Sequence, residues 1–121
     1  MRSPPGALIT NTRTKRILCR DERICASPWL KFRGLMFSRQ KNLVFLFARP
    51  SYISLHMLFV FFPIDVLFLD SKKKVVEIKQ HILPFTAYVP AHAASAVIEL
   101  SDGVVKKTGT RIGDTIHIST L

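Results

Sequence analysis

Four polar side chains that could take part in chemistry lie inside apolar stretches of the chain: His56, Asp65, Glu77 and Glu99. A carboxylate that is buried without a partner is costly, so each of the three acids should pair, accept hydrogen bonds or reach solvent. Asp65 follows Pro63 by two residues at the start of a predicted strand, where its side chain could accept hydrogen bonds from backbone N–H groups. Because titratable groups also gather in ligand-binding clefts, the same residues are candidates for a site.

These residues have a structural and a functional interpretation, and the structural one is favoured. Asp65 is expected to make a structural hydrogen bond, as buried polar groups generally do, and the functional hypothesis places it with Arg33 or His56 in a ligand-binding cleft. Glu99 is expected to be exposed on a strand surface, with a salt bridge to Arg33 or Arg111 as the alternative. His56 is expected to be a satisfied core or interface histidine rather than a catalytic base. The candidate ligand-binding residues are Arg33, His56, Asp65 and Glu99.

Catalysis has no positive support in the sequence. It shows no Ser-His-Asp spacing and no glycine-rich phosphate loop. The two cysteines, Cys19 and Cys25, lie six residues apart and the four histidines are scattered, so neither a metal site nor a cofactor is expected. An enzyme that uses Asp65 and His56 is therefore the weakest functional hypothesis.

The positive charge of the chain is concentrated in its first half. Residues 1–50 hold eleven Lys/Arg against Asp21 and Glu22, which is most of the net +10 of the whole chain. Basic residues interleaved with aromatic ones can grip phosphates while rings stack on bases, and Trp29, Phe32 and Phe37 follow the basic cluster. The alternative is a solvated basic face that keeps an apolar protein in solution. The candidate nucleic-acid-binding residues are Arg13, Lys15, Arg16, Arg20 and Arg23.

The longest apolar run, from Tyr52 to Asp70, must position the candidate site. A transmembrane helix needs about 20 mostly apolar residues, and Pro63 and Asp65 interrupt this run. Its Phe, Val, Ile and Leu content favours strands, so the run predicts two buried strands, Ile53–Phe61 and Ile64–Leu69. No membrane association is expected.

The rest of the chain predicts one mainly β domain. Residues 1–6 are expected to be a frayed N-terminus and residues 7–121 a single barrel or sandwich with one or two short helices. A helix is predicted from Pro28 to about Met36, and a helical turn from Ser101 to Lys107 that ends at Gly109. The further predicted strands are Ala7–Asn11, Lys15–Arg20, Arg23–Ala26, Leu43–Ala48, Lys74–Lys79, Ala96–Leu100 and Thr115–Ser119. Asp21-Glu22 would form a hairpin turn that brings Cys19 near Cys25, and residues 81–95 would wrap over the surface.

An ordered series of short motifs resembles one known family. The series is Arg33-Gly34-Leu35-Met36-Phe37, Phe45, Met57, Pro63-Ile64-Asp65, Phe68-Leu69-Asp70, Val75-Val76-Glu77-Ile78, Ile98-Glu99-Leu100, Gly103 and Gly113-Asp114. In this order the motifs are similar to the uncharacterised family catalogued as domain of unknown function 192. The resemblance covers roughly residues 27–119, and it implies a compact, mainly β fold with short helices and no established activity. Many relatives carry Trp-Met-Lys-Asn-Thr where this chain has His56-Met57-Leu58-Phe59-Val60, so the polar members of that motif are apolar here.

Three hypotheses about function follow. The first is a non-enzymatic binding or accessory protein with an unknown ligand, the second a nucleic-acid-binding module, and the third an enzyme. The opening residues lack the apolar segment that export requires, so a cytoplasmic protein is expected. A monomer or a homodimer through an apolar strand edge is expected.

Overall fold

The computed structural model describes residues 7–25, 43–56 and 62–120, and the following statements concern these residues. Within the strands, the side chains of residues 20–25 and of Ala7, Leu43, Ala48, His56 and Thr120 are not described. The predicted helix Pro28–Met36 and the N-terminal residues 1–6 lie outside the described ranges.

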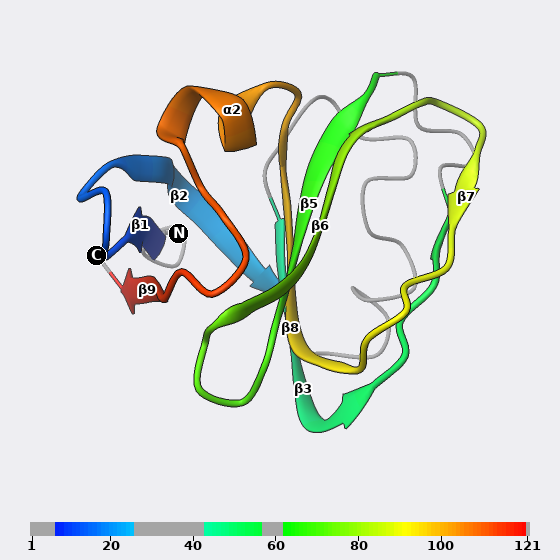
Figure 1. Cartoon of the computed structure of the whole chain (residues 1–121), viewed down its shortest axis with the longest axis horizontal. Coiled ribbons are helices and arrows are strands. Elements are labelled where there is room, and N and C mark those ends of the chain that lie inside the picture. Colours follow the sequence, from blue (N-terminus) through cyan, green and yellow to red (C-terminus); the bar gives the residue numbers. More distant parts are fainter. Residues whose placement is uncertain (1–6, 26–42, 57–61, 121) are drawn as a thin grey trace, which may run out of the picture.

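Nine strands and one short helix make up the described fold (Figure 1). The helix is α2, Val104–Thr108. The strands are β1 Ala7–Asn11, β2 Ile17–Cys25, β3 Leu43–Ser51, β4 Leu55–His56, β5 Ile64–Leu69, β6 Val75–Ile82, β7 Ala87–Tyr88, β8 Ala94–Ser101 and β9 Ile116–Thr120. The mainly β fold with a short helix that the sequence predicts is thus confirmed.

Seven of these strands form one sheet whose two edges meet. The strand order is β6-β5-β8-β3-β2-β1-β9, and all neighbours are antiparallel except β2 and β3. The N–H of Val75 donates to the carbonyl of Asp114 at 2.9 Å, and the N–H of Ile116 donates to that of Lys73 at 2.9 Å. These bonds join the start of β6 to the segment that enters β9, so the sheet closes on itself as a small barrel.

The central strands are buried on both faces, which explains their continuous apolar sequences. Alternate residues of β5 point to opposite sides of the sheet and pack into two separate clusters. The barrel core draws on every strand of the closed sheet and comprises Ile9, Leu18, Cys19, Val44, Leu67, Leu69, Val75, Ala96, Ile98, Leu100, Val105 and Ile116. The outer core lies on the other face of β3, β5 and β8 and comprises Phe45, Leu55, Ile64, Val66, Phe68, Ile82, Ala94 and Val97.

Helix α2 covers one end of the barrel. Val105 is buried in the barrel core, while Lys106 and Lys107 on the same helix are exposed. Gly103 and Gly109 flank the helix with φ values of 89° and 67°. Both values lie in the left-handed region that glycine adopts readily, so these two glycines fix where the helix begins and ends.

Several sequence predictions differ from the structure. The hairpin at Asp21-Glu22 is wrong because β2 runs uninterrupted from Ile17 to Cys25, which places Cys19 and Cys25 on one strand. β2 pairs with β1 at Glu22 and with β3 at Arg23, and this pairing on both edges outweighs the local preference for a turn. The predicted strand Ile53–Phe61 has only Leu55–His56 in strand form within the described residues, and residues 57–61 lie outside them.

The C-terminal part of the chain follows the predictions closely. β5, the β5–β6 hairpin, β8, the stop of α2 at Gly109 and β9 are confirmed, with bounds shifted by one or two residues at most strands. Ser101 belongs to β8, so Gly103 rather than a serine precedes α2. None of the described helices is long and apolar enough to cross a membrane.

Candidate functional site

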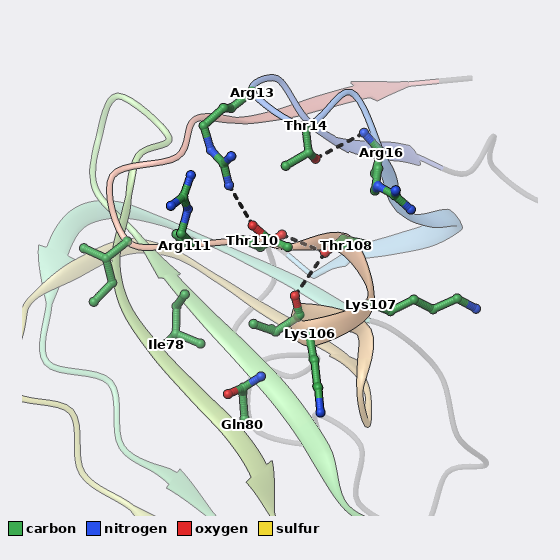
Figure 2. Close-up of a pocket in the computed structure, with 13 residues that line it drawn as sticks. Arg13, Thr14, Arg16, Ile78, Gln80, Lys106, Lys107, Thr108, Thr110 and Arg111 are labelled. Carbon is green, nitrogen blue, oxygen red and sulfur yellow. Dashed lines mark hydrogen bonds between the residues drawn. The ribbon is translucent and has the colours of Figure 1, made fainter.

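A basic groove lies between α2, the turn that follows β1, and β6 (Figure 2). It is an open hollow of about 980 Å³, and α2 and the segment after it form much of its wall. Figure 2 shows Arg13 and Arg111 on one side of the hollow and Arg16 and Lys107 on the other, while Lys106 extends in the direction of Gln80. The cations that line the groove are Arg13, Arg16, Lys106, Lys107 and Arg111.

Asp114 links the turn after β1 to the segment after α2, which form two sides of the groove. Its carboxylate is buried and accepts hydrogen bonds from Arg13 Nε at 2.6 Å, from Asn11 Nδ2 at 2.8 Å and from the N–H of Arg111 at 2.8 Å. Asn11 also donates to Thr110 Oγ1 at 3.1 Å, which adds a second link between β1 and the segment after α2. The hydrogen bond from Arg13, helped by those from Asn11 and Arg111, outweighs burial and holds the pKa of Asp114 well below its usual range.

We expect Asp114→Asn to lower the free energy of unfolding by about 2–3 kcal/mol at neutral pH, because charge-assisted bonds to a buried acceptor are lost. A lowered pKa gives stability that is present above the unfolded value of about 3.9 and is lost as the pH falls through the folded value. Urea unfolding of both proteins should therefore show a difference at neutral pH that shrinks in acid. Asp102→Asn is the control, because Asp102 pairs with His81 at the surface. Equal stability of the Asp114→Asn and wild-type proteins at neutral pH would contradict this role.

Four cations of the groove are available to a ligand. Arg13 is engaged by Asp114 and by the carbonyl of Gly109, at 2.7 Å from Nη2. Arg16, Lys106, Lys107 and Arg111 are exposed, and their side chains make no hydrogen bond or ion pair with any described residue. No Asp or Glu is among the residues that line the hollow, so the charge of these four cations is not compensated within its lining.

The basic surface continues past α2 into a second, smaller hollow of about 360 Å³. The two hollows share Arg16, Lys107 and Thr108, and the second one adds Lys15. Neither lining contains an aromatic residue of the described chain, so the surface offers cations and hydroxyl groups but no stacking platform.

The predicted nucleic-acid-binding residues are divided by the structure. Lys15 and Arg16 line the basic surface, whereas Arg13 supports it through Asp114. Arg20 and Arg23 lie on β2, and their side chains are outside the described set. The sequence-based prediction missed Lys106, Lys107 and Arg111, although three cations within six residues were a visible signal.

The predicted ligand site around Asp65 is not assembled by the described residues. Asp65 is in register with Leu100 and Glu99 with Val66, so the two acids point to opposite faces of the sheet. Of His56 only the backbone is described, and Arg33 lies outside the described ranges. Asp65 and Glu99 therefore belong to separate environments.

Asp65 makes the structural hydrogen bonds that its position suggested. The side chain is 1% exposed; Oδ1 accepts from the N–H of His81 and Oδ2 from the N–H of Val105, each at 2.9 Å. β6 carries an extra residue here, because Ile64 and Val66 pair with Ile82 and Lys79. The carboxylate thus fixes this bulge and the first turn of α2 to β5.

We expect Asp65→Asn to destabilise the protein by about 2 kcal/mol, since an amide can accept only one of the two bonds made to the carboxylate. The same substitution should speed amide hydrogen exchange at His81 and Val105, measured residue by residue by NMR. Unchanged exchange at both amides would show that the carboxylate does not hold these two segments.

Glu77 is the third buried acid that accepts hydrogen bonds from several donors. It accepts hydrogen bonds from the Tyr88 hydroxyl, from His92 Nδ1 at 2.8 Å and from the N–H groups of Ala91 and His92 at 2.9 and 3.0 Å. Burial alone would raise the pKa of Glu77, but the bonds from Tyr88 and His92 outweigh it and leave the pKa lowered. The same pairing and burial raise the pKa of Tyr88 to about 12. Through these hydrogen bonds Glu77 holds the segment after β7 close to the outer core.

Glu99 differs from the other acids. The sequence suggested an exposed side chain, but the residue is 7% exposed, and its Oε2 has no hydrogen-bond partner in the described chain. The alternative pairing with Arg111 is wrong as well, because Arg111 lines the basic groove and makes no ion pair with Glu99. Burial raises the pKa of the Glu99 carboxyl to about 8.

The sequence is similar to a family without assigned activity. A family model described as Uncharacterized ACR, domain of unknown function 192, matches residues 9–118. A UPF0127 protein of Thermococcus sibiricus is 40% identical over 98 residues, which are 78% of this chain and 63% of that protein. A UPF0127 protein of Pyrococcus furiosus is 34% identical over 91 residues, which are 72% of this chain and 77% of that protein. The match thus spans less than two thirds of the Thermococcus relative.

Two solved structures share the fold. A protein of unknown function from Novosphingobium aromaticivorans superposes with a TM-score of 0.81 at 20% identity, over 96% of this chain and 93% of that one. A protein from Sinorhizobium meliloti described as a putative transcription regulator gives a TM-score of 0.81 at 20% identity, over 98% of both chains. At this identity the likeness shows the fold alone.

Proposed function

Since this chain belongs to the uncharacterised family of domain of unknown function 192, in which no activity is assigned, we propose a function from its own surface. The protein is a non-enzymatic binding protein that holds a phosphate-bearing ligand in the basic groove. The observation that carries this proposal is the set of four cations, Arg16, Lys106, Lys107 and Arg111, that surround one hollow without a described partner.

The chemistry of the groove suits phosphate. Arginine forks and lysine ammonium groups bind phosphate oxygens through charge-assisted hydrogen bonds. Thr14, Thr108 and Thr110 add hydroxyl groups to the same lining, although the hydroxyls of Thr108 and Thr110 already bond to each other at 2.8 Å. Because Arg13 and Asp114 already fix the turn against the segment after α2, the cations are presented from a supported frame.

The groove favours binding over catalysis. No His, Cys, Asp or Glu is among the described residues that line it, so it offers no imidazole, thiolate or carboxylate for acid–base chemistry and no carboxylate set for a metal ion. A reaction would need such a group within reach of the bound phosphate. We therefore infer that the groove holds its ligand unchanged.

Nucleic acid is the second candidate, and it shares the phosphate chemistry. The continuation of the basic lining into the hollow at Lys15 supports a ligand that carries more than one phosphate. The structural relative from Sinorhizobium meliloti is described as a putative transcription regulator, which is in keeping with this candidate. Without aromatic side chains in the lining, contacts would go to the backbone, so binding would depend steeply on salt and little on sequence.

The test is a binding titration of the full chain with three probes at low and at physiological salt. The probes are a fluorescent single-stranded oligonucleotide, the corresponding duplex, and inorganic tripolyphosphate as a competitor or as a sole ligand. Oligonucleotide binding that weakens sharply with salt supports the nucleic-acid form of the proposal. Binding of tripolyphosphate alone supports a small phosphate ligand. Failure of all three probes to bind at low salt would overturn the proposal and leave the charge as a solubility feature.

A further inference from the structure

Glu99 stands apart from the three other buried acids of the described chain. Asp65, Glu77 and Asp114 each accept between two and four hydrogen bonds from identified donors. Oε2 of Glu99 is the single buried side-chain oxygen or nitrogen among the described residues that has no partner. Native structures leave few such groups, and each calls for a physical explanation.

The sheet itself cannot satisfy this oxygen. On the face where the Glu99 side chain lies, its neighbours in register are Val66 on β5 and Leu43 on β3, and neither residue type carries a side-chain donor. The backbone N–H groups of a central strand are engaged in the ladders on both sides. Any donor to Oε2 must therefore come from above the sheet.

The described cation closest in register does not serve this purpose. Lys79 pairs with Val66, one strand further from Glu99 on the same face. Its ammonium group lies over the ring of Tyr88, 5.7 Å from the ring centroid. The Lys79 ammonium group thus interacts with the ring of Tyr88, and no described residue compensates a negative charge on the Glu99 carboxylate.

We propose that Glu99 is the anchor of a second binding site, which takes an organic cation with N–H donors, an ammonium or a guanidinium group. Such a group supplies both the hydrogen bond that Oε2 lacks and the charge that a buried carboxylate needs. On binding, the proton of the carboxyl passes to solvent and the ion pair replaces it. This site is independent of the basic groove, which selects ligands of the opposite charge.

Two further observations support the proposal. Burial raises the pKa of Glu99 to about 8, so the empty site holds a proton rather than a buried charge at pH 7. The residue as a whole is 7% exposed and Oε2 itself is buried, so an ion pair formed there would be largely shielded from water. A carboxyl with these properties can change from a neutral to a charged state when a cation arrives.

The test follows the side-chain carboxyl resonance of Glu99 in the full chain, labelled with carbon-13, during titration with methylguanidinium chloride. Tetramethylammonium chloride is the matched probe, since it has the same charge and no N–H donor. We expect methylguanidinium to shift the resonance saturably and to lower the pKa of Glu99 by about one unit, which corresponds to about tenfold preference for the ionised carboxyl. Tetramethylammonium should leave both unchanged.

Two variants separate the site from general effects of salt. Glu99→Gln should remove the saturable rise in the thermal midpoint that methylguanidinium gives the wild-type protein, while Asp102→Asn should keep it. Equal effects of the two salts, or no saturable shift at millimolar concentrations, would show that Glu99 is only a buried structural acid. If Glu99→Gln does not fold, the titration of the wild-type resonance decides alone.

Discussion

Replacing Glu99 with glutamine is expected to remove most of the loss of stability that the wild-type protein shows as the pH rises from about 5 to about 8. A raised carboxyl pKa gives stability that is fully present below the unfolded value of about 4.3 and is lost as the pH rises through the folded value of about 8. The difference between these two pKa values should lower the free energy of unfolding of the wild-type protein by roughly 3–4 kcal/mol over this pH range. Glutamine has nearly the same shape as glutamate and no proton to lose. The free energy of unfolding of the Glu99→Gln variant should therefore not change with pH over this range.

Urea unfolding at several pH values measures this effect directly. Asp102→Asn removes a surface carboxylate and controls for the loss of one negative charge. The result expected is a wild-type curve that falls with pH, a Glu99→Gln curve that does not, and an Asp102→Asn curve that follows the wild type. Parallel curves for all three proteins would mean that the Glu99 carboxyl is solvated or paired in solution.

Reversing two charges of the basic groove should nearly abolish binding of phosphate ligands. The double substitution Lys107→Glu with Arg111→Glu replaces cations on both sides of the hollow, and Lys107 also lines the second hollow. Oligonucleotide affinity at low salt is expected to fall by about 100-fold, and the slope of log affinity against log salt by about two. Both residues are exposed and make no described side-chain bond, so the thermal midpoint should change little.

The matched control reverses two lysines of the β5–β6 turn. Lys72→Glu with Lys74→Glu changes the net charge by the same amount, and neither lysine lines either hollow. Fluorescence anisotropy of the three proteins separates a local site from a general effect of net charge. An equal loss of affinity in both double variants would show that binding follows overall charge and not the groove.

Most strands of the C-terminal half were predictable from local pattern. β5 is an apolar run bounded by Pro63 and Asp70, and the turn after Asp70 leads directly into β6. The end of α2 at Gly109 was predictable because a left-handed residue commonly terminates a helix. In these segments local preference and tertiary contacts favour the same structure.

Two features of the fold were hidden from the sequence. β2 contains the polar residues Asp21 and Glu22 at its centre, and only its pairing with both β1 and β3 keeps it extended. Glu99 alternates with apolar residues, which normally indicates an exposed face. β8 has a core on each side, so alternation along this strand does not report exposure.

The candidate site was predictable only in part. Arg13, Lys15 and Arg16 stand out as basic residues, but Lys106, Lys107 and Arg111 are about ninety residues away in the chain. Closure of the barrel and the contacts of Asp114 bring the two groups together. No local pattern specifies that closure, so the groove could not be located before the fold was known.

The pairing of β1 with β9 has a consequence for how the protein folds. Ile9 lies opposite Ile118, so β1 obtains one of its two partners only after the intervening strands have been synthesised. Pairing across such a long loop costs closure entropy before the contacts that stabilise the pair have formed. Topologies with many such distant pairings fold slowly. A nascent chain therefore exposes one edge of β1 until β9 emerges, and a circular permutant that joins the two strands by a short linker is expected to fold faster than the natural order.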